Sequence, residues 1–201
     1  MSSDWSSDVC SSDLKTTTTA WVAAALAAAQ RPVVRATTVG MYLDETVLDL
    51  PRSYQGFIEA MRTGYERGGR YAALELTSEA LMRGFAKAWP PEVGVFTNLS
   101  HDHLDAHGSP EHYLASKAQL FLTLPKGGTA VLNGCDEHAP LLEQVVPSGV
   151  RVLCYGLRSR GEPTSSLDVE AVDVSVGWDG TRLELTTSPL LPPGPSQLRI
   201  G

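Results

Sequence analysis

The chain has 201 residues, of which 42% are hydrophobic and 19% charged, so it can form a buried core and disorder is not expected. Its formal net charge is −7 at pH 7 and its 16 Lys and Arg residues are scattered, which argues against a nucleic-acid partner. The three cysteines lack metal-ligand spacing, fit a reducing cytoplasm and indicate neither disulfides nor a zinc site.

The first 14 residues repeat Ser-Ser-Asp three times, starting at Ser2, Ser6 and Ser11, without a helical or strand period. The last seven of them are also what a common sequencing adaptor encodes in one reading frame. We therefore expect residues 1–14 to be an assembly artefact without packed structure. A genuine disordered N-terminal tail is the alternative.

An Ala-rich helix is expected over residues 16–30. The run ends in three alanines, Ala27 to Ala29, and so resembles a signal peptide. Acidic residues precede it where a signal peptide has basic ones, and it is shorter than the roughly 20 residues that cross a bilayer. The run is better explained as a buried helix, and we expect no membrane association.

Strand-like and helix-like segments alternate along the next part of the chain. The expected strands are residues 32–39, 71–76, 93–97, 129–133 and 150–154, and the expected helices are 53–67, 78–88, 109–123 and 137–145. This alternation predicts an α/β fold, a mostly parallel P-loop-type sheet with helices on both faces. Residues 167–174 and 181–186 alternate apolar and polar around Asp179-Gly180, which predicts a C-terminal antiparallel β hairpin.

Ligands of parallel sheets sit at the carboxyl ends of the strands, so the residues that follow each strand are the first candidates for a site. Glu75 ends one apolar strand, where a carboxylate is costly unless it is paired or bound to a cation. After another strand, residues 97–108 place three His and two Asp within seven positions. This composition favours a site for phosphate with Mg²⁺ rather than Zn²⁺.

Lys15 and Thr16 before the Ala-rich helix form the second half of a P-loop. In such a loop the lysine contacts phosphates and the hydroxyl contacts Mg²⁺. The glycine-rich first half is absent, and a polar helix start is the simpler explanation of these residues alone. Lys117 lies on the helix over 109–123, and nothing local distinguishes it from a solvated lysine.

Taken in order, five segments resemble the Mur ligases, most closely the MurE branch. They are Lys15 to Thr19, Glu75 to Ser78, Phe96 to Gly108, Glu111 to Lys117, and Val131 to Asp136. The block from Thr97 to Gly108, with its spacing to Lys117, is the most specific. The resemblance covers roughly residues 15–190.

The resemblance implies an ATP-dependent ligase that joins a carboxylate to an amine through an acyl phosphate, in the synthesis of peptidoglycan precursors. It assigns Lys15, Thr16, Thr17 and Asn98 to ATP, and Thr16, Glu75, His103 and Lys117 to magnesium. Glu75, His103 and Lys117 would be catalytic, with Lys117 carbamylated. The implied partners are small molecules, an amino acid and a carboxylate-bearing peptide or nucleotide-sugar peptide.

The acceptor side departs from the MurE pattern. Where MurE enzymes carry Thr-Thr before the second helix, this chain reads Leu48-Asp-Leu-Pro-Arg-Ser53. Thr77 and Arg83 are the remaining candidates for substrate contacts. A MurE-like ligase of other specificity, similar to folylpolyglutamate or cyanophycin synthetases, is therefore an alternative, as is a nucleotide-binding protein without catalysis.

The same resemblance predicts how the chain is organised. Residues 15–190 would form a truncated central ATP-binding domain, and residues 191–201 a tail toward a C-terminal domain. Without the P-loop glycines the chain lacks the nest of N–H groups that binds phosphate, and we expect it to be inactive alone.

Overall fold

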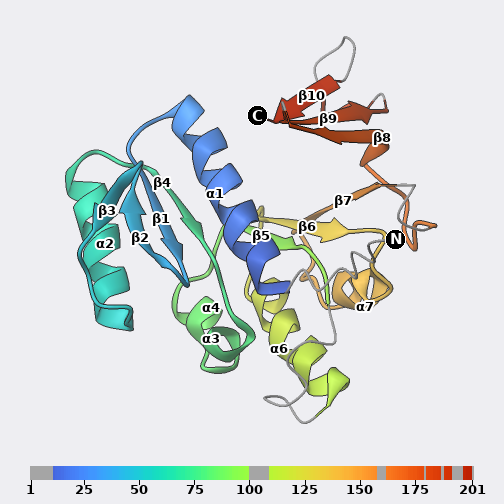
Figure 1. Ribbon diagram of the computed structural model, residues 1–201. Helices are drawn as coiled ribbons and strands as arrows, with labels where there is room; N and C mark the ends of the chain where they lie inside the picture. Colours follow the sequence, from blue (N-terminus) through green and yellow to red (C-terminus); the bar gives the residue numbers. More distant parts are fainter. Residues whose placement is uncertain are drawn as a thin grey trace, which may run out of the picture. The chain divides into compact units, whose positions relative to one another are not determined.

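The computed structural model describes residues 11–99, 109–157, 162–178, 180–186, 188–191 and 197–200. The chain forms two compact units, Met1–Thr77 and Ser78–Gly201, and each has its own sheet (Figure 1). Among the described residues no helix is both long and apolar enough to cross a membrane.

The first unit contains a four-stranded sheet and two long helices. Its elements are α1 (Ser11–Ala29), β1 (Val33–Thr37), β2 (Gly40–Leu43), β3 (Thr46–Leu48), α2 (Tyr54–Glu66) and β4 (Tyr71–Leu74). The strand order is β3-β2-β1-β4; β1 and β4 are parallel, and the other pairs are antiparallel. The carboxyl ends of β1 and β4 therefore lie side by side.

Consecutive residues of β1 point to opposite faces of this sheet, and each face carries one helix. Val33 packs in a small core with Ala23 of α1 and Ala73 of β4. Val34 faces α2, where Gly64 allows a close approach: a Cβ at this glycine would lie 2.3 Å from Cγ2 of Val34. Helices thus cover both faces of this sheet.

The second unit contains a six-stranded sheet. Its elements are α3 (Ser78–Met82), α4 (Phe85–Ala88), β5 (Val93–Phe96), α6 (Pro110–Leu122), β6 (Thr129–Asn133), α7 (Ala139–Gln144), β7 (Arg151–Leu157), β8 (Val169–Gly177), β9 (Gly180–Leu185) and β10 (Gln197–Ile200). The order is β10-β9-β8-β7-β6-β5; the strands from β5 to β8 are parallel, and β8, β9 and β10 are antiparallel neighbours.

The core of the second unit lies between α6, α7 and one face of β5, β6 and β7. Its buried residues are Phe96, Ala118, Phe121, Leu124, Ala130, Leu132, Ala139, Leu142 and Cys154. On the opposite face of the edge strand β5, Val93 and Val95 are exposed. α3 and α4 pack against α6.

The predicted fold class is confirmed, and the structure differs from it in four details. The parallel strands belong to two sheets rather than one, and residues 40–48, expected to be loop, form β2 and β3. The helix expected over 78–88 is interrupted at Gly84, whose φ of +80° is left-handed. A tenth strand, β10, lies in the stretch expected to be a tail.

The start of α1 was also wrongly predicted. The helix begins at Ser11, not near residue 16, so residues 11–14 are helical rather than without structure. No glycine or proline stands between Ser11 and Thr16 to end the helix there.

Candidate functional site

Glu75 follows β4 and carries its carboxylate to the shared end of β1 and β4. Its backbone N–H donates to the carbonyl of Ala36 at 2.8 Å, which continues the parallel ladder past the end of the strand. Oε2 accepts hydrogen bonds from the hydroxyl of Thr16 at 2.7 Å and from the backbone N–H of Thr38 at 3.1 Å. The hydroxyl of Thr38 lies 3.3 and 3.4 Å from the two carboxylate oxygens.

This cluster unites two of the predicted magnesium ligands, Thr16 and Glu75, although they stand 59 positions apart. Its side chains offer oxygen atoms only, one carboxylate and two hydroxyls, which is the donor set that Mg²⁺ prefers. Thr38 was missed in the sequence. The feature that could have identified Thr38 is its position directly after β1, at the strand end where ligands are expected.

Lys15 does not occupy the position that a P-loop requires. A helix leaves only its first four backbone N–H groups without intrahelical partners, and Lys15 is the fifth residue of α1. The hydroxyl of Thr19 donates to the carbonyl of Lys15 at 2.8 Å, a bond within the helix. The predicted helix N-terminus at Lys15 is therefore wrong. Thr17 is exposed on the same helix.

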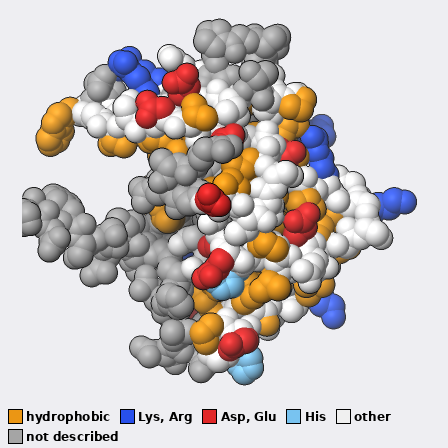
Figure 2. Space-filling view, turned by 90° about the vertical axis from the view of Figure 1, so that its right-hand side faces the viewer, with side chains coloured by type: hydrophobic (Ala, Val, Ile, Leu, Met, Phe, Trp, Pro, Cys, Tyr) orange, Lys and Arg blue, Asp and Glu red, His pale blue; other side chains and the backbone are white. Residues whose placement is uncertain are grey.

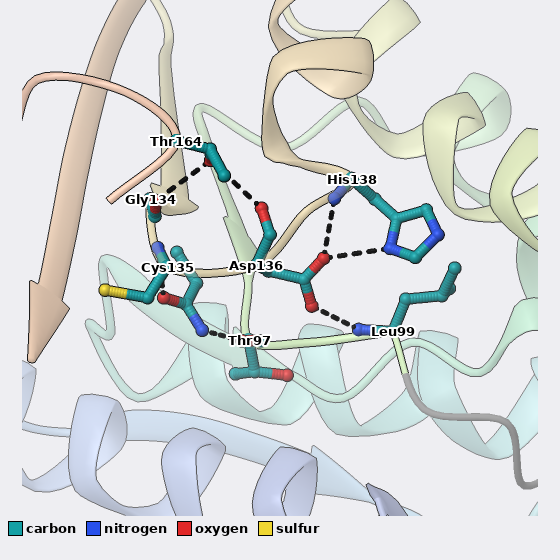
Figure 3. A network of polar contacts seen from close by, with 8 residues as sticks. Thr97, Leu99, Gly134, Cys135, Asp136, His138 and Thr164 are labelled. Atoms are coloured by element: carbon teal, nitrogen blue, oxygen red, sulfur yellow. Dashed lines mark hydrogen bonds and ion pairs between the residues drawn. The ribbon is translucent and has the colours of Figure 1, made fainter. Parts of the chain in front are cut away.

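A second polar network lies at the carboxyl ends of β5, β6 and β7 in the second unit (Figure 3). Asn133 ends β6, and its Nδ2 donates to the carbonyl of Thr97 at 2.8 Å. Oδ2 of Asp136 accepts from the backbone N–H of Leu99 at 2.9 Å. The loop after β6 is thereby joined to the loop after β5.

Asn98, predicted to bind the nucleotide, stands between those two anchored residues. Its Oδ1 is buried and has no hydrogen-bond partner in the part of the chain that the structure describes. Buried acceptors without a partner are rare in native proteins, because no hydrogen bond offsets the free-energy cost of removing the atom from water. This acceptor is therefore suited to meet a donor or a cation from a ligand.

The remaining bonds of the network fix the loop after β6. Oδ1 of Asp136 accepts from the backbone N–H of His138 at 2.9 Å and lies 3.0 Å from Nδ1 of the same ring. The hydroxyl of Thr164 donates to the carbonyls of Gly134 and Asp136 at 3.0 and 3.2 Å. The sequence contained the segment around Asp136 without indicating any of these contacts.

Burial raises the pKa of two side chains of β7, Tyr155 and Cys154. The pKa of Tyr155 is raised to about 12, mainly by burial and also by electrostatic interaction with Asp136 and Cys135. The Tyr155 hydroxyl donates to the carbonyl of Phe96 at 3.2 Å. Burial also raises the pKa of the Cys154 thiol, with contributions from Glu143 and Asp168. Both groups are therefore neutral at pH 7.

Lys117 lies in α6, four residues after the buried Tyr113. Its Nζ is 4.8 Å from the centre of the Tyr113 ring, within the range of a cation–π interaction. The ring thus gives Lys117 a defined environment that the sequence did not indicate.

The other predicted residues are less informative. Thr77 is half-buried, and Arg83 is exposed in an ion pair with Glu79 at 2.7 Å. His103 lies outside the described residues, within which no group of three or more His, Cys, Asp or Glu could hold a metal ion. Lys and Arg side chains are scattered over the face drawn in Figure 2, without a basic stripe.

Two bacterial ligases are similar in sequence to most of this chain. A UDP-N-acetylmuramoyl-L-alanyl-D-glutamate–2,6-diaminopimelate ligase from Geobacter metallireducens is 34% identical over 179 residues, which is 83% of this chain and 34% of the relative. The enzyme of the same name from Chlamydia pneumoniae is 31% identical over 179 residues, 85% of this chain and 34% of the relative. The chain thus spans about a third of the length of these curated relatives.

Solved structures and a family match agree with these relatives. A structure of a UDP-N-acetylmuramoyl-L-alanyl-D-glutamate–2,6-diaminopimelate ligase superposes with a TM-score of 0.72 and 26% identity, covering 91% of this chain and 36% of that one. The S73A mutant of L. casei FPGS shares the fold, with a TM-score of 0.61 and 15% identity over 88% of this chain and 48% of that one. Residues 12–195 match the Mur ligase middle domain. The chain belongs to the Mur ligase middle-domain family.

Proposed function

We propose that this domain serves an ATP-dependent ligase that joins a carboxylate to an amine in the synthesis of peptidoglycan precursors. The names of the relatives support the reaction class and the pathway. The observation that carries the proposal is the placement of Glu75, with Thr16 and Thr38 bonded to it, where β1 and β4 end. The proposed reaction takes place in the cytoplasm, on small-molecule substrates and without nucleic acid.

The oxygen atoms around Glu75 fit a magnesium ion. We assign Thr16 and Glu75 to the metal, together with His103 and a carbamylated Lys117. Carbamylation converts the lysine from a cation to an anion and so gives it oxygen ligands for a hard ion. Bound magnesium would neutralise phosphate charge, which is its main contribution to phosphoryl transfer.

ATP would supply a phosphoryl group to the substrate carboxylate, and the amine would then displace phosphate from the acyl phosphate to leave an amide. This chain's residues would position the reactants and balance charge. Lys15 and Thr17 would contact phosphate, and Asn98 would accept a hydrogen bond or bind a cation through its buried Oδ1.

One part of the phosphate site does not fit. Residues 1–14 contain no glycine, and Lys15 lies inside α1 rather than at its N-terminus. The backbone N–H groups that cradle phosphates in a P-loop are therefore not provided. We propose that the 201-residue chain alone does not turn over ATP.

A chimaeric ligase, called the graft below, tests the domain with a complete phosphate loop. Residues 15–190 would replace the matching segment of the Geobacter metallireducens ligase, whose own sequence would precede Lys15. We expect ATP-dependent phosphate release with UDP-N-acetylmuramoyl-L-alanyl-D-glutamate and an amino acid. Release only with a glutamate-tailed pterin would refute the cell-wall assignment. Thr77 and Arg83, our candidates for substrate contacts, would be substituted in the same graft.

Lys117→Ala in the graft tests catalysis against simple nucleotide binding. We expect turnover to fall by at least about a hundredfold, the scale of a lost electrostatic group in an active site. Lys87→Ala, which removes an exposed lysine of α4, is the matched control and should leave turnover unchanged. Equal turnover in both variants would contradict the role given to Lys117.

A further inference from the structure

Two side chains of the loop after β6 hold the backbone on either side of Asn98 (Figure 3). Asn133 binds the carbonyl of Thr97, and Asp136 binds the N–H of Leu99, at 2.8 and 2.9 Å. The two bonds lie directly before and directly after Asn98 in the chain. Together they fix the peptide groups that set the direction of its side chain.

Each of the two holding side chains is itself held. Oδ1 of Asn133 accepts from the backbone N–H of Cys135 at 3.1 Å. Oδ1 of Asp136 binds the backbone N–H of His138 at 2.9 Å. Both polar atoms of each side chain are hydrogen-bonded, so neither side chain can rotate without losing bonds. The network therefore holds the loop more rigidly than any one of its hydrogen bonds would alone.

This arrangement explains how a buried acceptor can remain without a partner. An unpaired buried oxygen is unfavourable, and a free loop would move until it found a donor. The bonds to Thr97 and Leu99 prevent that movement. The Oδ1 of Asn98, which has no partner among the described residues, is therefore held in a position where a bound ligand can donate to it.

We propose that Asn133 and Asp136 are positioning residues that lock Thr97 to Leu99 and present Asn98 as an acceptor. The presented oxygen receives an electropositive group, either a magnesium ion or an N–H donor of the nucleotide. The nature of this group rests on the proposed function. The locking of the loop does not.

Amide exchange and NMR of the 201-residue chain test the lock without ATP. Asn133→Asp retains the oxygen that accepts from Cys135 but removes the donor to Thr97. Asp136→Asn retains the shape and leaves one of its two acceptor atoms. In both variants we expect the backbone amides of Asn98 and Leu99 to exchange at least about tenfold faster than in the parent chain. The side-chain amide resonance of Asn98 should move toward the chemical shift of an asparagine in a disordered chain.

Thr164→Val is the matched control. Its hydroxyl belongs to the same network and, among the described residues, bonds the carbonyls of Gly134 and Asp136 rather than Thr97 to Leu99; its backbone N–H still bonds Gly134 at 2.8 Å. We expect exchange at Asn98 and Leu99 to match that of the parent chain. Equal exchange in the parent, Asn133→Asp and Asp136→Asn would overturn the lock, as would an equal acceleration in Thr164→Val. Thermal unfolding would establish that each variant is folded.

The ligand is tested by titrating the parent chain with magnesium chloride alone, ATP alone, or both, while the Asn98 side-chain amide is observed. We expect this resonance to shift at about millimolar ligand concentrations in the parent chain. In Asn133→Asp the same shift should require about tenfold higher concentrations. A response to magnesium alone identifies a cation contact, and a response to ATP alone identifies an N–H donor. No response to either would overturn the ligand half of the proposal, whereas the ligase assignment is decided separately by the ligation assay.

Discussion

Glu75 binds Thr16 and Thr38 at a strand end, and its hydrogen bonds and the magnesium contact that we propose for it make different demands on its side chain. As a hydrogen-bond acceptor for two threonines, it needs an oxygen atom but no charge. As a ligand for a divalent cation, it needs the charge. A substitution that keeps the shape and removes the charge therefore distinguishes structure from binding.

We predict that Glu75→Gln changes the free energy of unfolding by less than about 1.5 kcal/mol, the net value of a typical hydrogen bond. The affinity for magnesium in the presence of ATP should fall at least about tenfold. Calorimetric titration of the grafted ligase measures the affinity, and urea unfolding of the 201-residue chain measures the stability. Thr38→Val, which keeps the carboxylate, should lose less affinity than Glu75→Gln; the opposite order would contradict the metal assignment.

Tyr155 gives a prediction about alkaline pH. Its pKa is raised by burial to about 12, whereas a tyrosine in an unfolded chain titrates near 10. Between these values the unfolded state has lost a proton that the folded state retains. The free energy of unfolding should therefore fall as pH rises through this interval, by roughly 1.4 kcal/mol per pH unit, and the contribution is complete below about pH 10.

The comparison with Tyr155→Phe isolates this effect from other groups that titrate at high pH. Urea unfolding of both proteins should show a stability difference that is constant below about pH 10 and shrinks above it. A difference that stays constant throughout would show that Tyr155 titrates normally.

At the scale of elements, the start of α1 governs the phosphate contact that we propose. The helix continues back to Ser11, so its free N–H groups precede Lys15 and Thr16. A glycine directly before Lys15 would favour an end to the helix there, because glycine is about 1 kcal/mol less favourable than alanine in a helix. Two substitutions are enough to write the full motif G-x-x-x-x-G-K-T in this chain.

We predict that Val9→Gly with Leu14→Gly raises the affinity of the 201-residue chain for ATP with magnesium at least about tenfold, by exposing N–H groups to the phosphates. Val9→Gly with Leu14→Ala is the matched control and should bind as the parent does. Fluorescence titration with a labelled nucleotide measures both. A control that gains as much as the glycine pair would refute this explanation.

The elements that could be predicted from the sequence are those with long or regular patterns. The alternation of apolar strands and helices from Val33 to Leu157 was sufficient for the fold class. β2 and β3 were missed because they are short and joined at Asp44, whose φ of +52° is reached without glycine. β10 has four residues in a Pro-rich stretch. The interruption at Gly84 was hidden by a helical pattern that continues on both sides of it.

The site was predicted unevenly for a similar reason. Glu75 and Asn98 follow strands, and the sheet rule selects such positions. Their partners are set by tertiary structure: Thr38 is 37 positions from Glu75, and Asp136 is 37 positions from Leu99. Local patterns carry no information on which strand ends become neighbours, so the role of Asn133 and Asp136 required the structure.

At the scale of the whole molecule, the second unit contains a hydrophobic core of its own. The core between α6, α7 and the second sheet is formed by residues that all lie within 78–201. A unit with its own hydrophobic core can fold alone. The second unit should therefore fold by itself.

We predict that residues 78–201, produced alone, unfold cooperatively in urea and keep the far-ultraviolet circular dichroism of a mixed α/β protein. Phe121→Ala in this segment should lower the free energy of unfolding by about 3 to 5 kcal/mol, because the side chain is fully buried. Leu122→Ala, at an exposed neighbouring position, is the control and should cost much less. A gradual transition without cooperativity would show that the segment does not fold by itself.

The edge strand β5 bears on how the purified protein behaves during storage. An edge strand exposes unpaired backbone groups to which a strand of another molecule can add, and Val93 and Val95 make this edge apolar on one side. Pro90, Pro91 and Glu92 stand directly before it, and proline and charge are the residues that natural edges use against such pairing. Proline and charge protect only the beginning of the strand, so aggregation at high protein concentration should start at its other, unprotected end.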